Sequence, residues 1–235
     1  MEAAEKVSLD KELQDSIDPK EYEIYTRRFS DQENQSREYV WSILCKDFFQ
    51  KYISPTASVL DIGAGDGYFI KQISAAQKYA LDLSPHAREL EKHGVKVFIQ
   101  PATNFRNTLP GKVDVVFMSN FLEHLRSKDQ LMQVLDEVRA VLKPTGKVII
   151  LQPNIRYVGP SYWDYIDHHI ALTEHSLAEA LEVCGFSVEE LIPRFLPYTV
   201  KSKLGHFSGL IRWYLKMPFL WKFFGAQTFV VGRPA

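Results

Sequence analysis

Residues 58–67 read SVLDIGAGDG, and this segment decides the fold. A short aliphatic run with Val59 ends in three glycines, and residues 67–77 then show helical periodicity, so we expect a strand, a tight turn and a helix. Gly63 permits the sharp turn, while Gly65 and Gly67 let the backbone approach a ligand closely. The segment is typical of a nucleotide-binding turn; the alternative is a tight connection that binds nothing.

The spacing of the glycines indicates which nucleotide this turn fits. The dinucleotide fingerprint G-x-G-x-x-G fails at its third glycine, because Tyr68 follows Gly67. Asp82 ends the next expected strand, about 20 residues beyond the turn, where this kind of fold places a carboxylate against ribose hydroxyls. An acidic residue at a helix N-terminus is also favourable without any ligand. Turn and carboxylate together predict an adenosine site rather than an NAD site.

Strand and helix patterns alternate along the chain. Strands are expected at 58–65, where the run ends in glycines, and at 78–83, 96–100, 114–120, 146–154, 186–193 and 228–232, with helices at 67–77, 84–94, 128–142 and 176–185. Ser84 is the expected N-cap of the second of these helices, with Pro85 at its first position. Two further helices are expected between residues 21 and 52, separated by the polar stretch 30–38. Alternating units of this length predict a parallel sheet with helices on both faces.

Composition sets the broad class of the protein. The 235 residues are 46% hydrophobic and 24% charged with a net charge of −1, which fits one α/β domain over 1–235 and gives no overall positive field for a nucleic acid. Cys45 and Cys184 lie far apart, which argues against a disulfide framework or a zinc site. The polar N-terminus predicts neither a signal peptide nor an anchor, so we expect a cytoplasmic protein.

Four segments carry a resemblance to a known family: DIGAGDG, YALDL, VDVVFMSNFLEHL and LKPTGKVIILQPN. In this order they resemble class I S-adenosylmethionine-dependent methyltransferases, over residues 59–154. The resemblance implies a Rossmann-like, doubly wound sheet of seven strands in the order 3-2-1-4-5-7-6, with strand 7 antiparallel and formed by TFVVG. It also implies S-adenosylmethionine as the cofactor and S-adenosylhomocysteine as the product. Within the domain we expect a flexible 1–20, N-terminal helices or a lid over 21–57, a core of 58–195 and 227–235, and a helical insertion over 196–226.

The resemblance also implies which residues meet the cofactor. Asp61 and Gly63 would approach its methionine part, Asp82 its ribose, Leu83 its adenine, and Asn120 its sulfonium. The remaining positions expected at the cofactor are Ala64, Gly65 and Phe121 beside them, and Tyr25 and Arg28 from an N-terminal lid. Family members commonly carry an acidic residue after strand 3, where this chain reads QPATN over 100–104, so Thr103, Asn104 or the backbone would replace that contact.

Candidate catalytic residues follow from the chemistry. Methyl transfer is an in-line displacement in which the enzyme mainly positions the acceptor, and a hydroxyl acceptor also needs a base. His124 follows strand 4, and His168 and His169 follow strand 5, so all three are candidates at the ligand-binding edge of the sheet. Local packing is the alternative for each. Adjacent histidines point apart and no H-x-x-x-H spacing occurs, so we predict no metal.

Residues 152–186 bear a weaker resemblance to bacterial methyltransferases of glycan, glycolipid and natural-product pathways. It implies an acceptor hydroxyl or amine on a small, sugar-like or lipid-linked metabolite. Tyr157, Tyr162 and Trp163 would stack on a sugar ring and Arg156 would pair with an anionic group, unless these residues simply pack a long loop. A non-catalytic cofactor-binding or interaction protein and a carboxyl methyltransferase remain alternatives. A nucleic-acid methyltransferase is disfavoured, because SNFL stands where a base-amine enzyme has an N-P-P-Y-like tetrapeptide.

The insertion between the last two strands contains the segment SGLIRWYLKMPFLWKFFG, over residues 208–225. Its apolar residues form one expected helical face, flanked by cations and broken at Pro218: Leu210, Ile211, Tyr214, Leu215, Phe219, Leu220, Phe223 and Phe224, with Arg212, Lys216 and Lys222. Such a face fits a peripheral contact with the inner side of a membrane, a homodimer contact through 208–224, a lid over an apolar acceptor, or packing within the chain.

Overall fold

The computed structural model describes residues 31–198 and 208–235, so Tyr25, Arg28 and the expected lid before residue 31 lie outside the described residues. The elements, with η for a 3₁₀ helix, are α3 (Asp31–Asp47), η1 (Phe49–Lys51), β1 (Ser58–Ile62), α4 (Tyr68–Gln72), β2 (Gln77–Asp82), η2 (Pro85–His93), β3 (Lys96–Ile99), β4 (Val113–Ser119), η3 (Leu122–His124), α5 (Lys128–Val141), β5 (Leu142–Pro153), α6 (Ile155–Val158), η4 (Gly159–Asp164), α7 (Glu174–Val183), β6 (Phe186–Leu196), α8 (Ser208–Lys216), α9 (Pro218–Phe224) and β7 (Gln227–Pro234).

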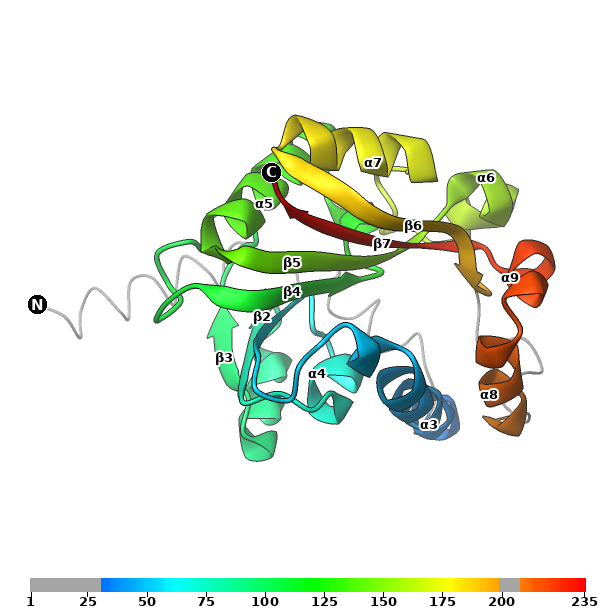
Figure 1. Ribbon diagram of the computed structural model, residues 1–235, viewed down its shortest axis with the longest axis horizontal. Helices are drawn as coiled ribbons and strands as arrows, with labels where there is room; N and C mark the ends of the chain where they lie inside the picture. Colours follow the sequence, from blue (N-terminus) through cyan, green and yellow to red (C-terminus); the bar gives the residue numbers. More distant parts are fainter. Residues whose placement is uncertain (1–30, 199–207) are drawn as a thin grey trace, which may run out of the picture.

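The seven strands form one sheet in the order β3-β2-β1-β4-β5-β7-β6 (Figure 1). Strands β1 to β5 pair in parallel, and β7 is antiparallel to both of its neighbours, so β6 runs in the same direction as β5. The expected strand order and the antiparallel strand 7 are confirmed. The carboxyl ends of β1 to β6 therefore share one edge of the sheet, and those of β4, β5 and β6 lie on the side of α6 and α9 in Figure 1.

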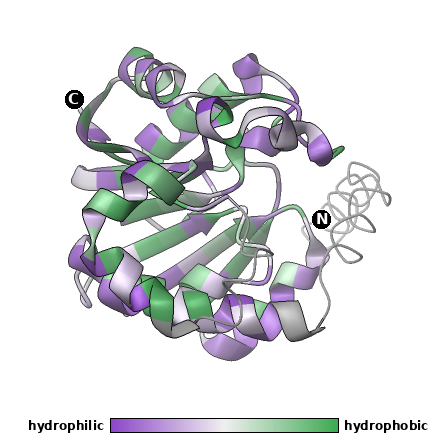
Figure 2. Ribbon diagram, turned by 90° about the vertical axis from the view of Figure 1, so that its right-hand side faces the viewer, coloured by the Kyte–Doolittle hydropathy of each residue, from purple (hydrophilic) through white to green (hydrophobic). Residues whose placement is uncertain are grey.

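Each face of the sheet packs against its own set of helices. Alternate residues of a strand point to opposite faces, so Val116 of β4 packs with α5 and α7, whereas Phe117 packs with α3, η1 and α4. The central strands are buried on both sides, and their ribbons in the middle of Figure 2 are largely hydrophobic. A hydrophobic core thus lies on each face of the sheet, and the two cores fix the positions of the carboxyl ends of the strands.

The expected break in the N-terminal helical region is wrong for its described part. The polar stretch 31–38 is helical, and α3 continues without interruption to Asp47. Glu, Gln and Arg are good helix formers. Gln35 and Glu38 are exposed here, whereas Ile43 and Leu44 enter the core. The absence of apolar residues marked an exposed helix face rather than a loop.

Two helices after β1 and β2 differ from their expected form. The helix expected over 67–77 ends at Gln72, because the side chain of Gln50 holds extended chain through hydrogen bonds to the N–H (2.9 Å) and the carbonyl (3.0 Å) of Ser74. The segment expected as a helix over 84–94 is the 3₁₀ helix η2. Its cap is as expected, with Ser84 Oγ accepting from His86 N at 3.3 Å.

The C-terminal elements follow the expected order with shifted bounds. Helix α7 begins at Glu174, after a capping box between Thr173 and Ser176, and β6 extends to Leu196. From residue 208 onward, the described part of the insertion holds two helices, with a new helix starting at Pro218 where the break was expected. Among the described residues no helix is both long enough and apolar enough to cross a membrane.

Candidate functional site at the carboxyl edge of the sheet

The glycine turn, residues Gly63 to Gly67, leaves β1 at the carboxyl edge of the sheet. Gly63, Gly65 and Gly67 have φ values of +68°, +52° and +69°, in the left-handed region that favours glycine. Gly67 N–H donates to the carbonyl of Ala64 at 2.8 Å, which closes the turn. A Cβ on Gly63 would lie 2.5 Å from the ring of Phe121, so this position accepts only glycine. The turn therefore needs its glycines both for backbone conformation and for space.

Asp82 at the end of β2 holds the glycine turn in place. Its Oδ2 accepts from the N–H of Gly65 at 2.8 Å, and its Oδ1 accepts from the N–H of Ser84 at 2.8 Å. Burial raises the pKa of the Asp82 carboxyl, and these backbone hydrogen bonds oppose that rise. The half-buried carboxylate lies at the position predicted for a ribose contact, and its two hydrogen bonds also give it a local structural role without any ligand.

Asp61 lies deeper than the other predicted cofactor residues. Its side chain is buried, and a backbone hydrogen bond ties it to Ile70 in α4. Burial raises the pKa of its carboxyl well above the usual value, and the charge of Asp82 adds to the effect. Asp61 thus links β1 to α4 on either side of the turn, and its predicted contact with the methionine part of the cofactor stays a prediction.

The end of β4 completes the floor of the predicted cofactor site. Asn120 is exposed and has φ +47°, the one positive value among the described residues other than glycine. Its N–H donates to the carbonyl of Leu151 in β5 at 2.9 Å, and its side-chain amide donates to Ser119 Oγ at 3.0 Å. Backbone strain of this kind is concentrated at functional sites. Phe121 follows, with its ring against Gly63.

The adenine side of the site is less defined by side chains. Leu83 leaves a large apolar side chain 41% exposed beside Asp82, which fits its predicted contact with a flat ring. Thr103 is half-buried and Asn104 is exposed. The backbone N–H of Asn104 donates to the carbonyl of Pro101 at 3.3 Å. Whether either replaces the missing acidic residue after strand 3 stays a prediction.

The structure brings two of the three candidate histidines together. The rings of His124 in η3 and His168 in the loop after η4 lie 5.2 Å apart, edge to face. His124 Nδ1 is 3.0 Å from the carbonyl oxygen of Asp167 and 3.3 Å from its Oδ2. His168 is buried, with Nδ1 2.8 Å from the carbonyl oxygen of Tyr162. The His124 ring is about one-third exposed and is therefore the one that a ligand can reach.

His169, by contrast, points away from this pair. The side chain of His169 is exposed, whereas that of His168 is buried. The backbone N–H of His169 donates to the carbonyl of Glu123 at 2.8 Å and holds the chain at this point. The expected divergence of the adjacent histidines is thus seen. The predicted absence of a metal stays a prediction, because donor atoms of Glu123, His124 and His168 lie within 4.8 Å of one another.

Glu123 is a site residue that the sequence reasoning missed. Its side chain is 1% exposed, its Oε2 accepts from Gln152 Nε2 at 3.0 Å, and its Oε1 lies 4.0 Å from His124 Nε2. Burial raises the pKa of its carboxyl, although the charge of His124 opposes the rise. The available signal was its position beside His124 in NFLEHL, directly after a strand whose carboxyl end faces the site.

The aromatic residues expected to stack on an acceptor divide into two groups. Tyr162 is fully buried and donates its hydroxyl to the carbonyl of Ile170 at 2.5 Å, so its expected stacking role is wrong and it anchors η4 instead. Trp163 is 54% exposed. Tyr157 is half-buried, with the guanidinium of Arg194 4.6 Å from its ring centre. Trp163 and Tyr157 keep surface that an acceptor can contact.

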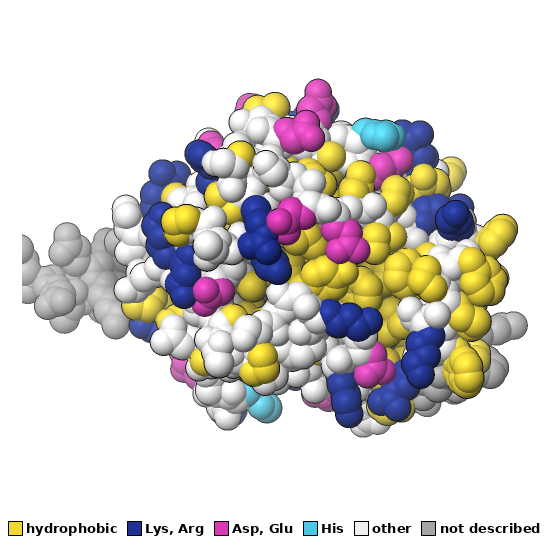
Figure 3. Space-filling view, in the orientation of Figure 1, with side chains coloured by type: hydrophobic (Ala, Val, Ile, Leu, Met, Phe, Trp, Pro, Cys, Tyr) yellow, Lys and Arg dark blue, Asp and Glu magenta, His cyan; other side chains and the backbone are white. Residues whose placement is uncertain are grey.

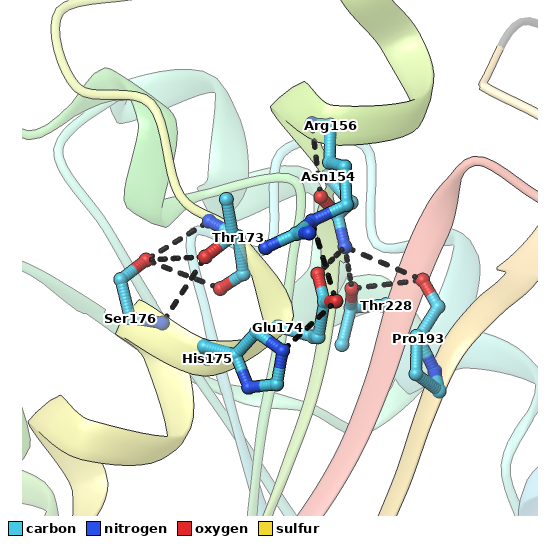
Figure 4. Close-up of polar contacts among 8 residues, drawn as sticks. All are labelled: Asn154, Arg156, Thr173, Glu174, His175, Ser176, Pro193 and Thr228. Carbon is cyan, nitrogen blue, oxygen red and sulfur yellow. Dashed lines mark hydrogen bonds and ion pairs between the residues drawn. The ribbon is translucent and has the colours of Figure 1, made fainter.

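Asn154, at the end of β5, is the centre of a buried polar network (Figure 4). Its Nδ2 donates to Glu174 Oε2 at 2.7 Å and to Thr228 Oγ1 at 2.9 Å, while its Oδ1 accepts from the N–H of Arg156 at 3.0 Å. Arg156 Nε lies 3.4 Å from Glu174 Oε1. The cation expected to meet an anionic acceptor is therefore already paired, although its side chain is half exposed.

Glu174 has a pKa set by this network. Burial alone would raise the pKa of its carboxyl, but the hydrogen bond from Asn154 and the charges of Arg156 and His175 bring it below the usual value. The network joins β5, β7 and the start of α7, so it fixes the loop that carries His168 and His169. Asn154 and Glu174 are structural supports for the site, and this role was not predicted from the sequence.

Comparison with known proteins agrees with this geometry. The family model described as "Methyltransferase domain" matches residues 33–191. No curated protein sequence is a detectable relative of the chain. Among solved structures, a SAM-dependent methyltransferase from Archaeoglobus fulgidus is 20% identical with a TM-score of 0.61, over 84% of this chain and 94% of that chain.

Two further similar structures are methyltransferases whose names specify the acceptor atom. A mitomycin 7-O-methyltransferase is 18% identical with a TM-score of 0.60, over 93% of this chain and 58% of that chain. The N-methyltransferase NodS from Bradyrhizobium japonicum is 14% identical with a TM-score of 0.54, over 77% and 88%. At these identities the likeness shows a shared fold, while the family model covers more than half of the chain. The chain therefore belongs to the methyltransferase domain family and is a class I methyltransferase with S-adenosylmethionine as its methyl donor.

Proposed function

We propose that this enzyme transfers the methyl group of S-adenosylmethionine to a hydroxyl or amine of a small, sugar-like or lipid-linked metabolite, in the cytoplasm. The observation that carries the proposal is that the predicted cofactor residues and the candidate base lie at the same edge of the sheet. The glycine turn with Asp82 and the His124–Asp167 pair both lie at the carboxyl edge of one sheet, at the ends of neighbouring strands β1 and β4. A donor site and a proton acceptor thus face the same space.

The residues present fit the cofactor. The glycines carry no side chains, so the cofactor can approach the backbone of the turn closely, and Asp82 offers carboxylate oxygens to ribose hydroxyls. Leu83 supplies an exposed apolar surface for adenine, and Asn120 presents its amide at the end of β4. When bound, S-adenosylmethionine supplies an electrophilic methyl group on a sulfonium. The chain holds that donor and excludes water from the line of attack.

His124 is the proposed base for a hydroxyl acceptor. Its Nδ1 faces the carbonyl and carboxylate oxygens of Asp167, so the proton belongs on Nδ1 and Nε2 is left to accept the proton of the acceptor. The carboxyl of Glu123, 4.0 Å from Nε2, stabilises the positive charge that then forms on the ring. His168 packs against the ring of His124 and is a positioning residue.

The acceptor would lie against the loop after β5. Trp163 is exposed there and Tyr157 is half-buried. Arg156 is half exposed, and it can bind an anionic group when its ion pair with Glu174 opens. Aromatic rings and an arginine fit a sugar phosphate or a lipid-linked sugar. The mitomycin 7-O-methyltransferase and the N-methyltransferase NodS share this fold, and their names specify an oxygen and a nitrogen acceptor.

The test is transfer of a radiolabelled methyl group from S-adenosylmethionine to a panel of sugars, sugar phosphates and glycolipids. Label in an alkali-stable product supports the proposal. Label released as methanol by mild alkali would indicate a methyl ester and the carboxyl alternative. Cofactor binding without label in any acceptor would favour the alternative of a non-catalytic cofactor-binding protein.

A further inference from the structure

We propose that the outer face of α8 and α9 docks on an anionic lipid surface, and that this docking brings the active-site edge to its acceptor. The purpose of this docking rests on the proposed function, but its existence does not. We call this surface the aromatic face; it consists of five exposed side chains, Leu210, Trp213, Phe219, Phe223 and Phe224.

The aromatic face is unusual in its exposure. The exposed fractions are 71% for Phe223, 64% for Trp213, 63% for Phe224, 58% for Phe219 and 47% for Leu210. Figure 3 shows hydrophobic side chains gathered at the right-hand end of the molecule, where Figure 1 places α8 and α9. Single exposed apolar residues are ordinary, but a group of large ones on two consecutive short helices marks an interaction surface.

The two helices are held to the body by their other sides. Ile211 and Tyr214 are buried, and the Tyr214 hydroxyl donates to the carbonyl of Phe195 at 2.6 Å. Trp221 Nε1 donates to the carbonyl of Tyr214 at 2.9 Å. A surface helix normally turns polar residues outward, whereas α8 and α9 have apolar residues on both sides. The expected single apolar face is thus wrong: one part packs inward, and the aromatic face remains outside.

Charge favours an anionic partner. After Glu190 the chain has no further Asp or Glu and contains seven Lys and Arg, whereas residues 1–190 hold 21 Lys and Arg against 29 Asp and Glu. Lys216 and Lys222 are exposed on α8 and α9 themselves. Phe and Trp beside Lys are the composition of helices that lie in the lipid interface, where cations add attraction to anionic headgroups. The remainder of the chain is acidic, so such a surface would orient the whole molecule.

A second copy of the chain fits this surface less well. In a two-fold dimer the same patch supplies both sides of the interface, so Lys216 and Lys222 would meet a second basic patch with no Asp or Glu from the C-terminal 45 residues. A single-stranded nucleic acid needs a groove lined by stacking rings and several cations. Here Arg212 already pairs with Asp47 at 3.0 Å, and the rings project outward from helices.

The aromatic face lies at the same edge of the sheet as the active site. Because β6 ends and β7 begins at the carboxyl edge, the insertion between them sits there, and its base is closed by a 2.7 Å hydrogen bond from Ala226 N to the carbonyl of Leu196. Asn154 N–H at the end of β5 also donates to Ala226, at 2.9 Å. A chain docked through the aromatic face therefore has its carboxyl edge beside the lipid surface.

The experiment is co-sedimentation of the full-length protein with phosphatidylcholine vesicles, with and without phosphatidylglycerol, at low and high salt. We expect binding to the anionic vesicles that weakens at high salt. The double substitution Phe219→Ser/Phe223→Ser should lower the partition coefficient by about tenfold or more, through loss of two apolar contacts with the lipid. Lys216→Glu/Lys222→Glu should remove the preference for anionic vesicles. Val183→Ser, an equally exposed apolar residue at the opposite edge, is the matched control and should bind as the parent does.

Several outcomes would overturn the proposal. These are no binding to anionic vesicles, equal binding by the Phe219→Ser/Phe223→Ser variant, a dimer in sedimentation velocity that this variant abolishes, or binding to a single-stranded oligonucleotide that this variant abolishes. Calorimetric titration with S-adenosylmethionine shows that each variant is folded. Vesicle binding without methyl transfer would count against the proposed function alone, and methyl transfer without vesicle binding would count against the docking alone.

Discussion

The backbone N–H of Gly65 donates a hydrogen bond of 2.8 Å to Oδ2 of Asp82. This contact joins the turn after β1 to the end of β2, so one carboxylate both shapes the turn and faces the expected ribose. A change at Asp82 should therefore affect the cofactor more than the stability of the fold, because the half-buried side chain lies at the edge of the sheet and not in its core.

We predict that Asp82→Asn weakens S-adenosylmethionine binding by roughly 10- to 100-fold, the loss expected for a hydrogen bond to a charged group. The amide keeps one oxygen for Gly65, so the turn can persist while a ribose acceptor is lost. Calorimetric titration measures the affinity, and thermal unfolding without ligand measures stability. An unchanged dissociation constant would remove Asp82 from the cofactor site.

Gly63→Ala should abolish cofactor binding. The new Cβ would meet the Phe121 ring at 2.5 Å in a left-handed backbone conformation, so the ring or the turn must move. Gly94→Ala is the matched control, since Gly94 has φ +74° but nothing within 4 Å of its Cβ position. That variant should lose about 1 kcal/mol of stability and bind normally. Equal affinities for both variants would show that the close packing at Gly63 is irrelevant to binding.

His124→Asn should lower turnover on a hydroxyl acceptor by about 100-fold or more while leaving S-adenosylmethionine affinity unchanged, because a base acts only on the acceptor. His169→Ala should keep most of the turnover, since the exposed His169 ring points away from the His124–Asp167 pair. The measurement is the initial rate of methyl transfer against acceptor concentration. A larger loss of turnover in His169→Ala than in His124→Asn would indicate that His169, and not His124, is the base.

Two buried glutamates should respond to pH in opposite ways. Glu174 has a lowered pKa, so its charge stabilises the fold above its ordinary pKa near 4.5, and this contribution is lost as pH falls through the folded value. Glu123 has a raised pKa, so its charge costs stability at neutral pH; this cost shrinks as pH falls below the folded value and is gone below the ordinary pKa near 4.5.

The corresponding substitutions separate these effects. Glu174→Gln should lower the free energy of unfolding at pH 7 by about 1–3 kcal/mol, with a smaller loss near pH 4. Glu123→Gln should be neutral or stabilising at pH 7, with any gain shrinking toward pH 4. Urea unfolding at the two pH values gives both free energies. Destabilisation of both variants by the same amount at pH 7 would contradict the opposite pKa directions.

Much of the fold follows from sequence because it depends on short-range patterns. The alternation of strand and helix periods predicted the core elements, and the glycine turn with Asp82 marked the carboxyl edge where the site lies. These features depend on backbone conformation and on which residues follow each strand. The strand order came from the family resemblance, and the pairing of β7 with β5 and β6 agrees with it.

The rest depends on packing between segments far apart in sequence. Whether His168 or His169 turns inward is decided by the hydrogen bond from His169 N–H to the carbonyl of Glu123. Tyr162 looked like a surface ring, yet its hydroxyl finds Ile170 inside the core. The apolar residues of α8 were predicted to form one face, because the sequence does not show that Ile211, Tyr214 and Leu215 pack against the body of the protein while Leu210 and Trp213 remain exposed.

The most direct test is calorimetric titration of the full-length protein with S-adenosylmethionine and, separately, with NADH. The glycine turn, the position of Asp82 and the family membership predict binding of S-adenosylmethionine with a micromolar dissociation constant and no binding of NADH. Binding of NADH alone, or of neither compound, would contradict the assignment of the carboxyl edge as a methyl-donor site.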